Sequence, residues 1–210
     1  MPWSVFLKAH WEALVAADFF DVEFWSWRGL VTHCVLFVID LATRRIRISG
    51  VTVHPNGDWM MQVGRNLLHM VDGPLMGKKY LVLDRDTKYC AAFRKMLARE
   101  GIRVIRLPPR SPNLNAICER VIGTIRRECL DWLIPLSESH LRSILTSWVE
   151  HYNRGRPHSS LGPGVPNPPG TLAMVQKVKS RHRLGEGVAV LAKSVLGGLH
   201  HEYSTVPSVG

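Results

Sequence analysis

The feature that most constrains the fold is the run from His33 to Asp40, whose interior is continuously apolar. A short run that is apolar on both faces is typical of a strand buried in the centre of a sheet. Residues 14–24 before it and 46–53 after it also have strand character, and only short turns separate the three stretches. Consecutive strands joined by short turns pair antiparallel. The first part of the chain is therefore expected to form a three-stranded antiparallel meander.

Helical and strand patterns alternate after the meander. Helical spacing over residues 59–71 is followed by a strand at 79–83, a helix at 89–99 and a strand at 102–107. Alternation of this kind predicts parallel strands joined by helices. Two more helices are expected, one after Asn113 and one from Ser137 to Tyr152. The whole predicts an α/β fold with a mixed five-stranded sheet, three antiparallel strands and then two parallel ones, flanked by helices.

Local composition divides the chain into four parts. Residues 1–13 are expected to form a short N-terminal helix, and residues 14–161 the core. Pro and Gly dominate residues 162–170, which is typical of a linker. Residues 171–210 form a small basic extension, interpreted as a strand pair or as partly disordered.

The charge favours a polyanionic partner. Lys and Arg number 27 against 17 Asp and Glu, a formal net charge of +10. This balance favours nucleic acid over a membrane surface. No apolar run is long enough to cross a bilayer, and no signal peptide is expected at the N-terminus. The 4 cysteines show no Cys-x-x-Cys pairing, so we expect a reduced, cytoplasmic protein with structural thiols.

Three carboxylates are candidates for a cation site. Period-2 alternation places Asp18 on the same face of its strand as apolar residues, where a carboxylate is costly unless it is paired or bound to a cation. The alternative is a strand-end Asp that reaches solvent. Asp84 follows the strand at 79–83, at the carboxyl end where ligands collect in parallel sheets. Glu119 lies on the polar face of the helix after Asn113, and alone it is a typical solvated residue.

Two other acids compete with these three. Asp40 lies in a polar turn, which favours turn chemistry over metal binding. Asp86 is two residues after Asp84, so in an extended chain both side chains point the same way, and Asp86 is an alternative ligand.

Four motifs in this order resemble the DDE integrase/transposase core of bacterial insertion sequences and retroviral integrases. They are Ala17-Asp18-Phe19-Phe20, Leu83-Asp84 with Tyr89 five residues on, Ser111-Pro112-x-x-Asn115-x-x-x-Glu119-Arg120, and Tyr152-Asn153-Arg154-x-Arg156-Pro157-His158-Ser159-Ser160-Leu161. The resemblance covers residues 14–165 and implies a ribonuclease H-like fold. The chain departs from the family in having Arg85-Asp86 where many members have Asn-Gly. It also begins close to the core, whereas the full enzymes carry an N-terminal DNA-binding region.

The resemblance implies a polynucleotidyl transferase. Asp18, Asp84 and Glu119 would hold two Mg²⁺ or Mn²⁺ ions, cleave the 3′ end of an element and transfer it to target DNA. The implied partners are element-end and target DNA, with a homo-oligomer assembled on them, associated with the nucleoid and not with a membrane. Candidates for contacting DNA phosphates are the basic side chains near the motifs, Arg110, Arg120, Arg126, Arg127, Arg156 and His158.

The basic residues also have simpler interpretations. Each arginine, taken singly, is typical of a solvated surface charge, and His158 could instead cap the end of a helix. Two alternatives concern the function of the whole chain. The chain could be a truncated, inactive transposase remnant that only binds DNA, or another nuclease of the same fold that acts on RNA–DNA hybrids.

Overall fold

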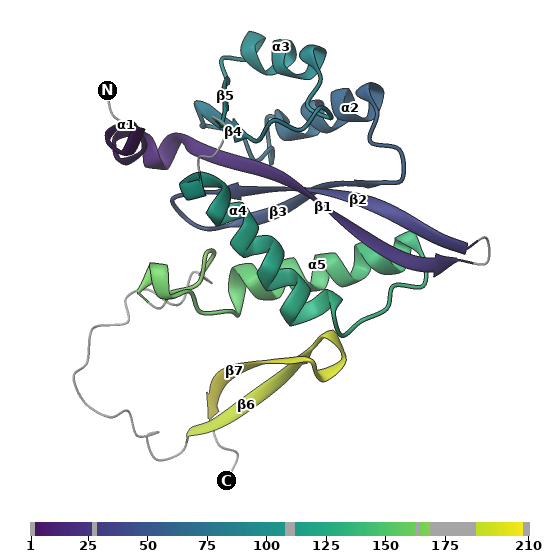
Figure 1. Ribbon diagram of the computed structural model, residues 1–210. Helices are drawn as coiled ribbons and strands as arrows, with labels where there is room; N and C mark the ends of the chain where they lie inside the picture. Colours follow the sequence, from purple (N-terminus) through teal and green to yellow (C-terminus); the bar gives the residue numbers. More distant parts are fainter. Residues whose placement is uncertain (1–2, 27–28, 108–111, 163, 169–187, 208–210) are drawn as a thin grey trace.

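The computed structural model describes residues 3–26, 29–107, 112–162, 164–168 and 188–207 (Figure 1). A five-stranded sheet with the order β3-β2-β1-β4-β5 forms its centre. The strands are β1 (Leu14–Ser26), β2 (Gly29–Asp40), β3 (Ile46–Thr52), β4 (Tyr80–Leu83) and β5 (Arg103–Arg106). β2 pairs antiparallel with β1 and β3, whereas β1–β4 and β4–β5 are parallel. The predicted mixed sheet is confirmed.

Helices cover both faces of the sheet (Figure 1). The helical elements before the C-terminal extension are α1 (Trp3–His10), η1 (Trp11–Ala13), α2 (Gly57–Leu67), α3 (Ala91–Arg99), α4 (Pro112–Ile125), η2 (Arg126–Leu130), α5 (Glu138–Arg154) and η3 (Ser159–Leu161). α2 and α3 pack on one face, and α4 and α5 on the other. Side-chain caps fix two of these helices at their starts, because Asn56 accepts from Trp59 N at 2.9 Å and Ser137 accepts from His140 N at 3.1 Å.

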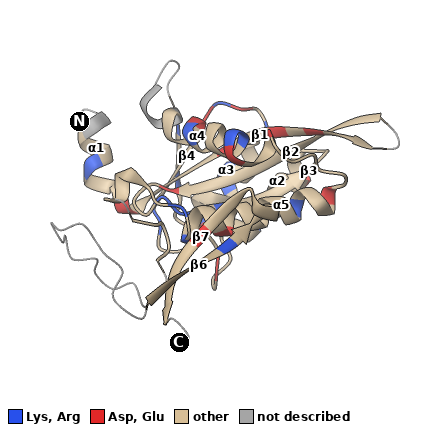
Figure 2. Ribbon diagram, turned by 90° about the horizontal axis from the view of Figure 1, so that it is seen from below, with Lys and Arg blue, Asp and Glu red and all other residues tan. Residues whose placement is uncertain are grey.

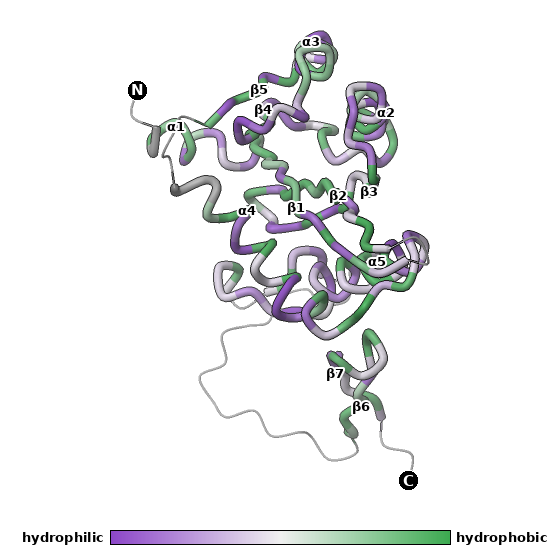
Figure 3. Tube along the Cα trace, turned by 45° about the vertical axis from the view of Figure 1, so that its right-hand side comes forward, coloured by the Kyte–Doolittle hydropathy of each residue, from purple (hydrophilic) through white to green (hydrophobic). Residues whose placement is uncertain are grey.

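The core consists of two apolar layers, one on each side of the sheet. Alternation along β1 divides its residues between them, so Ala16 and Phe20 pack toward α4 and α5 whereas Val15 and Ala17 pack toward α2 and α3. Trp148 of α5 is fully buried in the first layer. The hydrophobic colouring of the strands between the helices in Figure 3 follows this arrangement.

Several predicted helix ends differ from those observed. The helix expected over residues 59–71 begins at Gly57 and ends at Leu67, and turns fill the rest up to β4. α4 is followed by a five-residue π-helical turn, η2, which the spacing of apolar residues did not predict. A π-helical turn has one more residue per hydrogen-bonded ring than an α-helix, so it changes which side chains face the core.

The C-terminal extension contains an antiparallel hairpin, as the strand-pair interpretation expected. It comprises β6 (Val188–Val195), η4 (Leu196–Gly198) and β7 (His200–Pro207). The hairpin contacts α5 and η2: His151 Nδ1 lies 2.9 Å from Glu202 Oε1, and His200 Nε2 donates to Glu128 O at 2.7 Å. The predicted linker and the predicted basic extension both lie partly outside the described residues. None of the helices in the described ranges is long and apolar enough to cross a membrane.

Candidate functional site

Asp18 lies in the middle of β1 and is 8% exposed. It faces the same apolar layer as Phe20, so the alternative of a strand-end Asp that reaches solvent is wrong. Its Oδ1 accepts a hydrogen bond from Phe19 N at 2.8 Å. Burial raises the pKa of this carboxyl to about 6, the Phe19 N–H opposes the rise, and the negative charges of Asp84, Glu119 and Asp86 add to it. The charges of three other acids thus act on a buried carboxylate.

Asp84 is brought beside Asp18 by strand register. In the parallel pair of β1 and β4, Ala17 is opposite Leu83. Asp18 and Asp84 directly follow this last pair in their respective segments, so they lie at the same end of the β1–β4 pairing. Asp84 is half-buried, and its Oδ1 accepts from Asp86 N at 3.0 Å.

The competing acids are already paired. Asp86 Oδ2 lies 2.7 Å from Lys88 Nζ, and its Oδ1 accepts from Lys88 N at 2.8 Å. Asp40 Oδ2 lies 2.6 Å from Lys78 Nζ, and its Oδ1 accepts from two backbone N–H groups of its own turn. The expected turn role of Asp40 is confirmed.

Glu119 approaches the other two acids from α4. It is exposed, and Cys118 beside it is buried against the sheet. Burial raises the pKa of the Cys118 thiol, and the charges of Asp18, Asp84 and Glu119 raise it further. The pKa values of two buried groups, Asp18 on β1 and Cys118 on α4, are therefore raised by the same two carboxylates. The charges of Asp84 and Glu119 thus act on both Asp18 and Cys118, although these acids are far apart in the sequence.

Tyr89 is buried in the apolar layer on the α2–α3 side of the sheet. Its ring lies 5.0 Å from that of Phe19 and 6.1 Å from that of Phe93. The residue is 2% exposed, and its hydroxyl has no hydrogen-bond partner among the described residues. Burial raises the pKa of Tyr89, and the charges of Asp18 and Asp84 raise it further. In the sequence motif, Tyr89 is only the aromatic residue five positions after Asp84, and no role was predicted for it.

The acids are chemically suited to a hard cation. Neither Asp18 nor Asp84 forms an ion pair with a Lys or Arg in the described part of the chain. Their donors are oxygens, which Mg²⁺ and Mn²⁺ prefer, and a cation would offset both the burial of the Asp18 charge and the smaller repulsion from the other acids. Within the same ranges, no three His, Cys, Asp or Glu side chains form a ready-made metal cluster. The residues fit a cation by chemistry and charge.

Comparisons with known proteins point in one direction. Residues 100–166 match a family model described as integrase core domain. The resemblance to an integrase core is confirmed. An insertion element IS136 protein of Agrobacterium fabrum is 25% identical over 148 residues, covering 67% of this chain and 74% of that protein. An insertion element IS476 protein of Xanthomonas euvesicatoria is 38% identical over 73 residues, which are 34% of this chain and only 20% of that protein.

Solved structures of two integrase core domains share the fold of most of this chain. The catalytic core domain of HTLV-2 integrase, determined with magnesium, has a TM-score of 0.55 at 11% identity and covers 74% of this chain and 93% of its own. The catalytic core domain of BIV integrase has a TM-score of 0.52 at 12% identity, covering 74% and 91%. At these identities the likeness shows the ribonuclease H-like fold and no more.

Three of the basic side chains predicted from the sequence are exposed on α4 and η2. Arg120 and Arg127 are exposed, and Arg126 Nη2 donates to Asp21 O at 3.1 Å. Gly123 leaves room for Arg127, because a Cβ at Gly123 would meet Arg127 Nη1 at 2.9 Å. Figure 2 shows basic and acidic residues together on α4. Arg110 lies outside the described residues.

The other two basic candidates have internal partners. Arg156 holds Glu128 with two hydrogen bonds, Nε to Oε2 at 2.8 Å and Nη2 to Oε1 at 2.7 Å. His158 is buried, and its Nε2 donates to Tyr152 O at 3.1 Å. The geometry of His158 matches the helix-capping alternative. The guanidinium fork of Arg156 is likewise occupied.

One residue of the last motif has a role that the sequence did not indicate. Asn153 is buried on α5, its Oδ1 accepts from Ile46 N at 3.0 Å, and its Nδ2 donates to Ile46 O at 2.9 Å. The amide thus joins α5 to the start of β3 in the manner of a neighbouring strand. No local pattern identifies such a partner.

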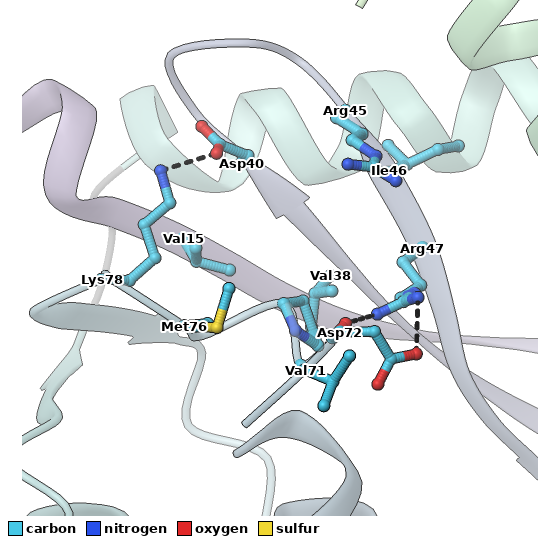
Figure 4. Close-up of a pocket in the computed structure, with 12 residues that line it drawn as sticks. Val15, Val38, Asp40, Arg45, Ile46, Arg47, Val71, Asp72, Met76 and Lys78 are labelled. Atoms are coloured by element: carbon cyan, nitrogen blue, oxygen red, sulfur yellow. Dashed lines mark hydrogen bonds and ion pairs between the residues drawn. The ribbon is translucent and has the colours of Figure 1, made fainter. Parts of the chain in front are cut away.

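A hollow of about 390 Å³ between the β2–β3 turn and the loop before β4 contains none of the three acids (Figure 4). Its charged residues are paired, Lys78 with Asp40 and Arg47 with Asp72. Because Asp40 and Asp72 are each paired with a basic side chain, this hollow offers no free carboxylate for the metal chemistry expected at Asp18.

Proposed function

We propose that this chain is the catalytic core of a DNA transposase that cleaves the 3′ end of an element and joins it to target DNA. The observation that supports this most is that the charges of Asp84 and Glu119 both act on the buried carboxylate of Asp18 and on the buried thiol of Cys118. The insertion-element relatives and the integrase core model support the same reaction class.

Asp18, Asp84 and Glu119 would hold two Mg²⁺ or Mn²⁺ ions. Bound divalent ions supply activation of a hydroxyl nucleophile and stabilisation of the leaving oxygen in phosphodiester chemistry. Asp18 would be the principal ligand, because it is the most buried of the three and the charges of both others act on it. Its raised pKa means that it takes up a proton readily when no cation is present, so cation and proton compete for this carboxylate.

Other residues of the core would position the substrate. Arg120, Arg126 and Arg127 lie on the exposed side of α4 and η2, near Glu119, where a DNA backbone would pass. Asp86 and Lys88 form an ion pair at the end of β4, and Lys88 Nζ lies 4.9 Å from the centroid of the Phe19 ring. This pairing keeps Asp86 from replacing Asp84 as a ligand.

We further propose that the protein works as a homo-oligomer on DNA in the cytoplasm, at the nucleoid. The HTLV-2 integrase core has been solved in dimeric and trimeric forms, and the integrase of simian T-cell lymphotropic virus in an intasome. The chain matches the IS476 and IS407 proteins over only 20% and 22% of their lengths. Recognition of element ends therefore belongs to this proposal and not to the observations.

The test is strand transfer of a pre-cleaved end oligonucleotide into a plasmid with Mg²⁺ or Mn²⁺. Asp84→Asn and Glu119→Gln are expected to lose activity by about a hundredfold or more, since removal of even a residue that only supports a ligand costs about 10–100-fold. Asp58→Asn, an exposed acid at the start of α2, is the matched control and should retain activity. Parental activity in both acid variants would overturn the proposal.

Two further assays separate the alternatives. Hydrolysis of RNA in an RNA–DNA hybrid without strand transfer would indicate a nuclease of the same fold. DNA binding without either reaction would indicate an inactive transposase remnant.

A further inference from the structure

A second hollow, of about 280 Å³, lies between α4, the end of β2 and the segment after α5. Its polar lining residues are Arg44, Arg120, Tyr152, His158 and Ser160. Apolar residues of β2 and α4 complete the wall, and no acid lines it. The hollow therefore presents two guanidinium groups and two hydroxyl groups in one concavity.

The two arginines lack acidic partners. Neither Arg44 nor Arg120 forms an ion pair with any residue of the described ranges, in contrast to Arg156, which holds Glu128. Arg44 instead stacks over the Trp11 ring, 5.4 Å from its centroid. Burial lowers the pKa of Arg44, the nearby Arg120 lowers it further, and Tyr152 acts in the opposite direction. Two cations held together without a counter-charge favour an anion between them.

The backbone at Arg44 supports the same conclusion. Arg44 has a φ of 63°, in the left-handed region that Gly or Asn adopts most readily. A non-glycine residue there costs on the order of 1 kcal/mol. The turn itself is held by Asp40, whose carbonyl accepts from Arg44 N at 2.9 Å. The residue type is thus unfavourable for the turn, and its side chain is directed over Trp11 into the hollow.

We infer that this hollow binds a phosphate of the DNA backbone, with Arg44 and Arg120 neutralising its charge and Ser160 and Tyr152 within the same cavity. This inference rests on the proposed function for the identity of the anion. Arg120 follows Glu119 directly but faces a different side of α4, since consecutive helical residues are about 100° apart. The bound phosphate would therefore be a neighbour of the reacting one and would fix the path of the strand past the acids.

Arg44→Gly provides a sharp test because glycine favours the observed backbone angle and the turn should be kept. The full chain is titrated against a fluorescent DNA duplex in EDTA at several KCl concentrations. Loss of one phosphate contact is expected to weaken binding several-fold and to reduce the slope of log K against log salt by about 1. Arg65→Gln, which removes one positive charge from an exposed position on α2, should leave the slope unchanged.

An unchanged slope in Arg44→Gly, with a normal thermal melt, would overturn the inference. Thermal stabilisation by inorganic phosphate at constant ionic strength distinguishes the source of the anion. If phosphate stabilises the parent and not Arg44→Gly while the DNA slope is unchanged, the hollow holds a free anion and the DNA assignment is wrong. The assay needs no metal and no catalysis, so an unchanged slope beside intact strand transfer refutes only this inference.

Discussion

Replacing Asp18 by Asn tests whether the buried carboxylate of Asp18 destabilises the fold when it is ionised. Asn has nearly the same shape and keeps the oxygen that accepts from Phe19 N, but it carries no charge. The rise of the Asp18 pKa from 3.8 to about 6 is caused chiefly by burial. That rise corresponds to about 3 kcal/mol of folding free energy lost when Asp18 is ionised, at about 1.4 kcal/mol for each unit of pKa. Asp18→Asn is therefore expected to increase the free energy of unfolding by up to about 3 kcal/mol at neutral pH without divalent ions.

The gain should depend on pH in one direction. A carboxyl whose pKa rises on folding stabilises the folded state below its unfolded pKa, and this stabilisation is lost as the pH rises through the folded value. The difference in stability between Asp18→Asn and the parent is thus near zero below pH 3.8, grows up to about 6 and is constant above that. Adding Mg²⁺ should reduce the difference, because a cation that binds only the parent stabilises only the parent.

Urea unfolding followed by tryptophan fluorescence, from about pH 4 to about pH 8, measures this difference. Asp58→Asn, which also removes one carboxylate but at an exposed position, is the control and should change stability by only a few tenths of a kcal/mol. A variant no more stable than the parent above pH 6, or a gain that does not change with pH, would refute the reasoning.

Three further predictions concern residues around the site. Asn153→Ala leaves the N–H and C=O of Ile46 unpaired and should cost about 2 kcal/mol or more in urea unfolding; a loss below 0.5 kcal/mol, roughly the effect of a surface change, would contradict the pairing. Tyr89→Phe removes a buried hydroxyl that has no partner among the described residues and should raise the free energy of unfolding by about 1 kcal/mol, seen as a higher melting temperature. Glu128→Gln should cost about 1–2 kcal/mol by breaking the two-bond pair with Arg156, and a double-mutant cycle with Arg156→Gln should give a coupling clearly different from zero.

Local patterns predicted the sheet and the placement of its acids. Period 2 along β1 assigned Asp18 to an apolar face, and the burial along the strand agrees. The end of a short apolar strand located Asp84, and helical spacing put Glu119 opposite the buried side of α4. These features depend on a few neighbouring residues, so the sequence alone carries them. The catalytic role of the three acids stays a prediction.

Features that depend on distant contacts could not be predicted. Asn153 is bonded to a strand 107 positions away in the chain, and no local periodicity encodes that pairing. The pairing of Arg156 with Glu128 could not be predicted, because Glu128 lies in a π-helical turn whose altered spacing is not visible in the pattern of apolar residues. No local pattern singles out Arg44, because its left-handed backbone and its place in a hollow beside α4 depend on the folded chain.

The side chains of α5 have a consequence for how copies of the chain can associate. β3 is an edge strand, and an open edge invites a strand from another molecule. Asn153 occupies the backbone of Ile46 at one end of β3, and Arg142 Nη2 donates to Val51 O at 2.6 Å near the other end. An incoming strand would have to displace both. The β3 edge is therefore protected from strand addition, and β5 is the edge of the sheet that α5 leaves open to another copy.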